Sequence, residues 1–110
     1  MTHEPHFTHG EYGEYHILVD TDDVRITEIT VAPGRLVPAH IHSQAQELCY
    51  CITGAVTVEI QGRPPHTLQP GENCRIPAEL THCLKNQGPL PCKFLLVHQD
   101  GAFDFIATGT

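Results

Sequence analysis

The stretch that decides the fold, residues 34–54, reads GRLVPAHIHSQAQELCYCITG. Within it, a single residue separates His40 from His42. On a β-strand both imidazoles therefore point to the same face, because side chains alternate with a period of two. The short polar turn 43–46 can return the chain so that Glu47 lies beside them on an adjacent strand. The stretch thus predicts neighbouring strands that present imidazoles and a carboxylate to one face.

The sequence on either side of this stretch also reads as short strands separated by proline and glycine. Turn signals recur at intervals of roughly eight to twelve residues, which is typical of an all-β sandwich or barrel. No segment repeats apolar residues at the i, i+3, i+4, i+7 spacing of an amphipathic helix. The predicted fold class is therefore all-β. We expect strands over residues 15–20, 24–31, 36–43, 47–53, 55–61, 73–76, 82–86, 92–98 and 103–107.

Composition limits the size of the protein and its partners. A chain of 110 residues supports one modest core, so we expect one domain over residues 14–110 after an N-terminal arm over residues 1–13. The 6 Lys and Arg against 13 Asp and Glu give a formal net charge of −7. This charge, and the lack of an apolar run of membrane length, argue against nucleic acid and membranes as partners. Since the first ten residues lack the apolar segment of a secretory signal, we expect a cytoplasmic protein with reduced cysteines.

The nine histidines direct attention to metal binding. His82, just after a turn at Pro77, lies on a segment that can pair near His40. Together with His42 and Glu47 it would complete a set of imidazoles and one carboxylate, a borderline site for Fe²⁺, Mn²⁺, Ni²⁺, Co²⁺, Cu²⁺ or Zn²⁺. An HxH pair alone is as often a surface pair without a role, so the glutamate and the distant histidine carry the hypothesis. The N-terminal histidines are interpreted as part of a loose arm rather than a second metal site: His3, His6 and His9.

The spacing of these residues resembles the cupin superfamily. The first cupin motif, G-x5-H-x-H-x(3,4)-E-x6-G, is matched by Gly34, His40, His42, Glu47 and Gly54. The second motif, G-x5-P-x-G-x2-H-x3-N, is matched by Gly71, Pro77, His82 and Asn86. The inner glycine of that motif is Glu79 here, at a turn position that carries no ligand. The resemblance covers residues 24–98.

The resemblance implies a single jelly-roll β-barrel that binds one divalent transition metal inside it through His40, His42, Glu47 and His82. It also implies a small metal-dependent enzyme that acts on a chelating small molecule, as a dioxygenase, isomerase, decarboxylase or lyase. In this interpretation Glu47 can also leave the metal and take up a proton. The alternative is a non-catalytic module that binds a sugar or another effector. Similar barrels commonly pair, so we expect a homodimer, with the N-terminal arm lying across the partner subunit.

Several residues near the motifs are candidates for the pocket. If Glu47 points inward, Cys49 and Cys51 do so as well, either as a soft pocket wall or as small buried hydrophobic residues. Arg75 is the best placed of the three candidate arginines to clamp an acidic substrate, although a solvent-facing or ion-paired arginine is the simpler interpretation. The other two candidates are Arg25 and Arg63.

His98 ends the apolar run Phe94–Val97. An imidazole titrates near neutral pH, so His98 is a candidate catalytic general base or a hydrogen-bond donor to a metal ligand. The alternative is a hydrogen-bonded histidine at a strand end, without a catalytic role. Tyr50 is expected to face outward, in an interface or in packing.

Overall fold

Short strands make up the fold, as the sequence predicts. In the computed structural model, which describes residues 7–10 and 13–108, all secondary structure consists of antiparallel β-strands. The strands are β1 (Phe7–Gly10), β2 (Gly13–Asp20), β3 (Val24–Val31), β4 (Leu36–Ile41), β5 (Gln46–Thr53), β6 (Val56–Ile60), β7 (His66–Leu68), β8 (Asn73–Ile76), β9 (His82–Lys85), β10 (Cys92–Gln99) and β11 (Ile106–Ala107).

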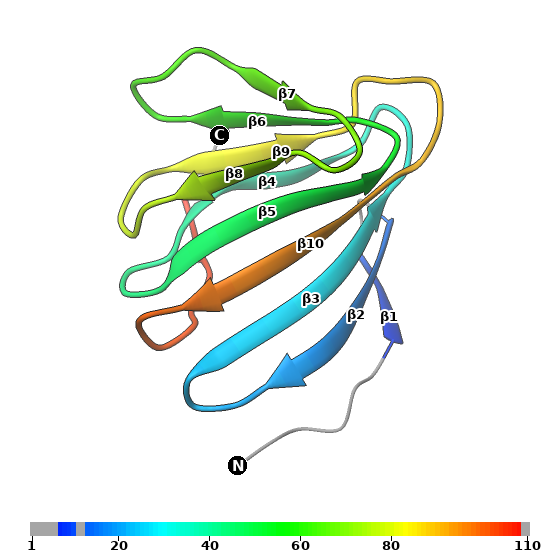
Figure 1. Cartoon of the computed structure of the whole chain (residues 1–110). Coiled ribbons are helices and arrows are strands. Elements are labelled where there is room, and N and C mark those ends of the chain that lie inside the picture. Colours follow the sequence, from blue (N-terminus) through cyan, green and yellow to red (C-terminus); the bar gives the residue numbers. More distant parts are fainter. Residues whose placement is uncertain (1–6, 11–12, 109–110) are drawn as a thin grey trace.

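The strands form two sheets that face each other (Figure 1). The 6-stranded sheet has the order β1-β2-β3-β10-β5-β8, and the 5-stranded sheet has the order β11-β4-β9-β6-β7. After β3 the chain passes back and forth between the sheets, which is the winding of a jelly-roll barrel. The predicted all-β barrel is therefore confirmed.

The core lies between the sheets, and it is filled by the inward half of each strand. In β10, burial alternates residue by residue: Cys92, Phe94, Leu96 and His98 are buried, and their neighbours are partly exposed. This is the period of two that a strand with one buried face requires. Phe94 is fully buried and belongs to the main apolar cluster. The outward-facing Tyr50 of β5 is 39% exposed, as the sequence predicts.

One row of ionisable residues crosses the 6-stranded sheet. His98 of β10 lies directly opposite Glu47 of β5 on one side and Arg25 of β3 on the other. Arg25 in turn lies opposite Asp20 of β2. Side chains that face each other across antiparallel strands point to the same side of the sheet. The sheet order therefore places a carboxylate, an imidazole and a guanidinium side by side at one level of the barrel.

Turns with left-handed backbone connect the strands. Gly54 has a φ of 73° and lies so close to the next segment that a Cβ atom would meet the Pro91 carbonyl oxygen at 2.8 Å and Cys92 Cα at 2.9 Å. Glu79, which replaces the inner glycine of the second motif, has a φ of 71°. The backbone therefore keeps a glycine-like conformation there although the side chain is a glutamate.

Apart from shifts of one or two residues at several strand ends, such as β4, which ends at Ile41, the strands differ from the sequence prediction at three places. Phe7–Gly10, expected to belong to a loose arm, forms β1 and pairs with β2. The short β7 was not predicted. The expected strand over 103–107 is reduced to Ile106–Ala107, and residues 103–105 instead contact the histidines described below, the two phenylalanines through their rings and Asp104 through its backbone oxygen. His3, His6 and the side chain of His9 lie outside the described residues. Within the described part of the chain, no helix has the length and apolarity that a membrane crossing needs.

Candidate metal centre

Four buried side chains converge between the sheets, and they are those that the two sequence motifs predict: His40, His42, Glu47 and His82. Each offers one ligand atom, and these atoms all lie within 4.8 Å of one another. His40 of β4 and His82 of β9 are cross-strand partners. His42 follows the end of β4, and Glu47 enters from β5 in the opposite sheet. Both sheets therefore contribute to the cluster.

Backbone carbonyls fix the tautomer of each of the three imidazoles. Nδ1 of His40 lies 2.7 Å from the Pro38 oxygen, Nδ1 of His82 lies 3.0 Å from the Leu80 oxygen, and Nδ1 of His42 contacts the Asp104 oxygen. A carbonyl oxygen only accepts hydrogen bonds, so each Nδ1 carries the proton. The Nε2 atom of each neutral ring is then left with a lone pair, which is the form that binds a metal.

The contacts of Glu47 show that this cluster suits a cation. Its Oε1 lies 2.9 Å from His42 Nε2 and 3.3 Å from His82 Nε2. With neutral rings, these contacts would place lone pairs against lone pairs. The other carboxylate oxygen, Oε2, is buried and has no hydrogen-bond partner among the described residues. A divalent cation would satisfy the orphaned oxygen and convert the repulsive contacts into ligation. The donor set therefore fits a metal ion.

In the absence of a metal, burial and the contacts with Glu47 shift pKa values in the cluster. Burial lowers the pKa of His40 to about 4. Burial also acts to lower the pKa of His82, but the contact with Glu47 outweighs it, and the net direction is upward. Burial acts to raise the pKa of Glu47, yet hydrogen bonds from His42, His82 and His98 hold it well below its usual range. The carboxylate is thus held in its ionised form, which is the form that ligates a metal ion.

His98 lies beside this cluster. Its Nε2 donates to Glu47 Oε1 at 2.7 Å, while its Nδ1 is buried without a partner among the described residues. The ring also packs against His42, with centroids 4.5 Å apart. His98 therefore contacts a candidate ligand directly, in the position expected for a donor to that ligand.

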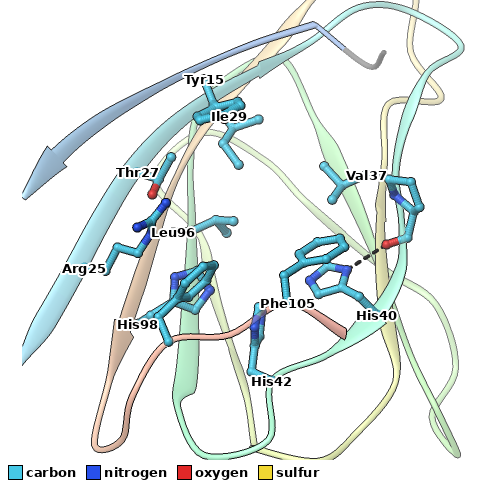
Figure 2. A pocket seen from close by; sticks show the side chains of 12 residues that line it. Tyr15, Arg25, Thr27, Ile29, Val37, His40, His42, Leu96, His98 and Phe105 are labelled. Atoms are coloured by element: carbon cyan, nitrogen blue, oxygen red, sulfur yellow. Dashed lines mark hydrogen bonds between the residues drawn. The ribbon is translucent and has the colours of Figure 1, made fainter. Parts of the chain in front are cut away.

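A cavity of about 440 Å³ opens beside the histidines (Figure 2). Two histidines of the cluster, His40 and His42, face it, together with the neighbouring His98. Most of the remaining wall is apolar, and Arg25 and Thr27 from β3 add polar groups. The lining residues are Tyr15, Arg25, Thr27, Ile29, Val37, Pro38, His40, His42, Leu96, His98, Phe103 and Phe105. A small molecule in this cavity would touch imidazole rings on one side and aliphatic and aromatic groups on the others.

The segment 103–105, which sequence reasoning did not assign to the site, closes over the histidines. The ring of Phe105 stacks on His40 with centroids 4.1 Å apart and planes inclined by 18°. Phe103 packs against His98 at 4.7 Å. Between them, Asp104 accepts a hydrogen bond from His42 through its backbone oxygen, and its carboxylate accepts from Ser43. The alternation of aromatic and acidic residues in this segment is a sequence signal, but it does not reveal the long-range partner.

The structure places the other predicted pocket residues elsewhere. Cys49 and Cys51 point inward and are fully buried, but they belong to the apolar core and do not line the cavity. Burial raises the pKa of the Cys49 thiol well above its usual value, so this thiol stays protonated. Arg75 is exposed and pairs with Leu48 on the outer face of the sheet, because the inward position of β8 is taken by Ile76. The arginine that lines the cavity is Arg25.

Comparison with known families agrees with the geometry. A family model described as the cupin domain matches residues 27–98. The chain belongs to the cupin family. The match begins within β3 and ends at His98, so it spans every residue of the candidate metal centre.

Individual relatives are distant from this cupin. The mannose-1-phosphate guanylyltransferase of Escherichia coli (strain K12) is 31% identical over 86 residues, which cover 78% of this chain and 18% of that protein. Among solved structures, a conserved protein with a double-stranded β-helix domain from Klebsiella pneumoniae has a TM-score of 0.76 at 21% identity, covering 96% of this cupin and 86% of that chain. The oxalate decarboxylase of Bacillus subtilis has a TM-score of 0.83 at 21% identity, covering 96% and 30%. These structures share the fold.

Proposed function

We propose that this cupin binds one divalent transition metal through His40, His42, Glu47 and His82, and that the metal holds and activates a small chelating molecule in the adjacent cavity. The observation that carries the proposal is the arrangement of donors. Each imidazole is fixed through Nδ1 by a backbone carbonyl, the Nε2 atoms of His42 and His82 lie against Glu47 Oε1, and Glu47 Oε2 is buried without a partner among the described residues. In ordinary packing, buried polar atoms of this kind have hydrogen-bond partners.

A metal bound here would supply a Lewis acid that polarises a carbonyl or hydroxyl oxygen of the bound molecule. The chain supplies the remaining functions. The apolar wall excludes water, and the fixed imidazoles orient the ligand atoms. Glu47, as a carboxylate, can take up a proton if it leaves the metal. His98 can accept a proton at Nδ1, the atom without a partner among the described residues. We therefore favour an enzyme, with Glu47 and His98 as proton carriers.

The donor set limits the metal to a class of divalent transition metals and does not select one of them. Imidazole and carboxylate donors suit Mn²⁺, Fe²⁺, Co²⁺, Ni²⁺, Cu²⁺ and Zn²⁺ alike. The Bacillus subtilis oxalate decarboxylase, which shares the fold, is described with Mn(II) centres. Mn²⁺ is therefore a suitable first ion for reconstitution.

A non-catalytic binding module is the second candidate. It is favoured by the length of the Escherichia coli mannose-1-phosphate guanylyltransferase, of which this chain matches 18%. A similar segment there is one part of a longer protein. A module would bind a sugar or another effector and release it unchanged, whereas an enzyme would convert it only when the metal is bound.

The test compares the wild type with His42→Ala and with His66→Ala, an exposed histidine on β7 that serves as the control. Elemental analysis after reconstitution with Mn²⁺ should give one ion per chain for the wild type and for His66→Ala, and a much lower content for His42→Ala. Incubation with 2-oxo acids, 2-hydroxy acids and sugar acids, followed by NMR, then shows conversion or binding without conversion. Equal metal content in all three proteins would contradict the assignment of the ligands.

Two further features are proposed from the sequence. The five cysteines are free, which is consistent with a reducing, cytoplasmic location. A homodimer is expected because strand β1 leaves an edge that a second copy can cover. Light scattering coupled to size-exclusion chromatography would test the dimer, and a species of about 12.2 kDa would contradict it.

A further inference from the structure

Arg25 is a cation in the wall of the cavity. It projects from β3 into the same space as His40 and His98 (Figure 2), and its side chain is 21% exposed. Of the residues that line this cavity, drawn from the described part of the chain, Arg25 is the only lysine or arginine. In a protein with a formal net charge of −7, it is therefore the local positive centre that an anionic ligand would need.

Two contacts fix the guanidinium in place. Nη1 donates to Asp20 Oδ2 at 3.0 Å, and Cζ lies 4.3 Å from the centroid of the Phe103 ring. A guanidinium held by an ion pair on one side and an aromatic face on another loses little further freedom when it binds a ligand. Arg25 is thus preorganised.

A third feature indicates that the arginine has unused binding capacity. Its Nε atom is buried and has no hydrogen-bond partner among the described residues. An unsatisfied buried donor costs about 1–3 kcal/mol. If Arg25 served only to pair with Asp20, a rotamer that gave Nε–H an acceptor would be more stable. Nε and the neighbouring terminal nitrogen together form the fork that matches the two oxygens of a carboxylate.

The position of Arg25 relative to the cluster sets the shape of the ligand. Arg25 and Glu47 lie on strands separated by one strand, β10. Strands are spaced by about 4.8 Å, so the two backbones are roughly 10 Å apart. Their side chains shorten this span to one that a small organic acid can bridge. His98 of β10 lies between them in the register, Leu96 also lines the cavity, and Phe105 lies over the histidines.

We infer that Arg25 anchors a carboxylate, and that the ligand of this cavity is a small carboxylic acid whose neighbouring hydroxyl or carbonyl oxygen points at the histidine cluster and whose remaining surface is apolar. The inference rests on the proposed metal centre for the second contact. Beyond the proposed function, the inference specifies the charge of the ligand and its orientation in the cavity. Asp20 acts as a positioning residue, because it contacts the guanidinium and does not line the cavity.

The test uses mandelate and mandelamide, which match in size and differ in charge, as probes of the Mn²⁺-loaded protein. Isothermal titration should show that the wild type binds mandelate at least tenfold more tightly than mandelamide. Arg25→Met should lower mandelate affinity at least tenfold, to the level of mandelamide, and leave metal content unchanged. Arg75→Met removes the same charge from the exposed face of β8 and should leave both affinities unchanged.

Arg25→Lys keeps the positive charge but lacks the fork, and it provides a second variant if Arg25→Met folds poorly. We expect the mandelate affinity of Arg25→Lys to lie between that of the wild type and that of Arg25→Met. Equal affinity of the wild type for the two probes, or mandelate binding that is unchanged in both Arg25 variants, would overturn the anchor while leaving the metal centre intact. Failure of the wild type to bind Mn²⁺, with mandelate binding that still depends on Arg25, would contradict the proposed metal centre and leave the anchor standing.

Discussion

His98 Nε2 lies 2.7 Å from Glu47 Oε1, directly across the pairing of β10 with β5. The hydrogen bond engages one carboxylate oxygen, and the other, Oε2, has no hydrogen-bond partner in the described part of the chain. The geometry makes His98 a support for the candidate ligand as well as a candidate proton carrier.

Replacing His98 should therefore weaken metal binding without removing a ligand. We expect His98→Phe to lower Mn²⁺ affinity roughly tenfold or more, as the loss of a hydrogen bond to a ligand commonly does. His98→Gln retains an N–H donor and should restore part of the affinity. Competition with a chelator of known affinity provides the measurement. If the phenylalanine variant binds Mn²⁺ as tightly as the wild type, the supporting role is wrong.

Gly54 and Gly34 allow steric crowding to be separated from backbone strain. Both have positive φ, 73° and 77°, but a Cβ at Gly34 meets nothing within 4 Å, whereas one at Gly54 meets backbone atoms at 2.8 and 2.9 Å. We expect Gly34→Ala to lower the free energy of unfolding by roughly 1–2 kcal/mol. Gly54→Ala should lower it clearly further, because the segment 91–92 must shift. Urea unfolding of the two variants compares them, and equal losses would contradict the close packing at Gly54.

Glu79 pays a conformational cost that glycine would not. Its φ of 71° is unfavourable for a residue with a Cβ atom, although glycine loses more chain entropy on folding. We expect Glu79→Gly to raise the free energy of unfolding by up to about 1 kcal/mol. Gln87→Gly, at an exposed position outside the positive-φ set, serves as the control and should be neutral or destabilising. Thermal unfolding that ranks the two variants in the reverse order would refute the strain at Glu79.

The buried imidazole of His40 makes the stability of the metal-free protein dependent on pH. Its pKa is lowered by burial from 6.5 to about 4. Between these values the unfolded chain binds a proton that the folded chain does not, so the free energy of unfolding should fall as pH decreases from 6.5 to 4. The contribution of this group is at most roughly 3 kcal/mol.

Urea unfolding over this pH range compares the wild type with His40→Asn, which lacks the titrating group. The asparagine variant should show a shallower fall in stability than the wild type, whereas His66→Asn, on the exposed face of β7, should behave like the wild type. Parallel pH profiles for the wild type and His40→Asn would show that His40 is not held neutral by the fold.

The sequence predicted those parts of the molecule that local spacing determines. The strand Val24–Val31 has the predicted bounds, and the residues that the motifs select converge in the barrel. Residues two apart share a face of a strand. This rule predicted that His40 and His42 point the same way and that Cys49 points inward.

Other features depend on contacts that spacing along the chain does not encode. Arg25 reaches the cavity because β3 is the neighbour of β10, a pairing between segments far apart in sequence. The sequence favoured Arg75 because it lies near the second motif, but one residue of register turns it outward, opposite Leu48. The segment 103–105 joins the site through hydrogen bonds to residues about 60 positions earlier, His42 and Ser43.

The central claim is that His40, His42, Glu47 and His82 hold one metal ion. The most direct measurement is anomalous diffraction from crystals of the protein reconstituted with Mn²⁺. The account predicts one anomalous peak per chain, with three imidazole nitrogens and a Glu47 oxygen at coordination distance, roughly 2.0–2.3 Å. A peak at another place, or no peak while the four side chains keep their arrangement, would contradict it.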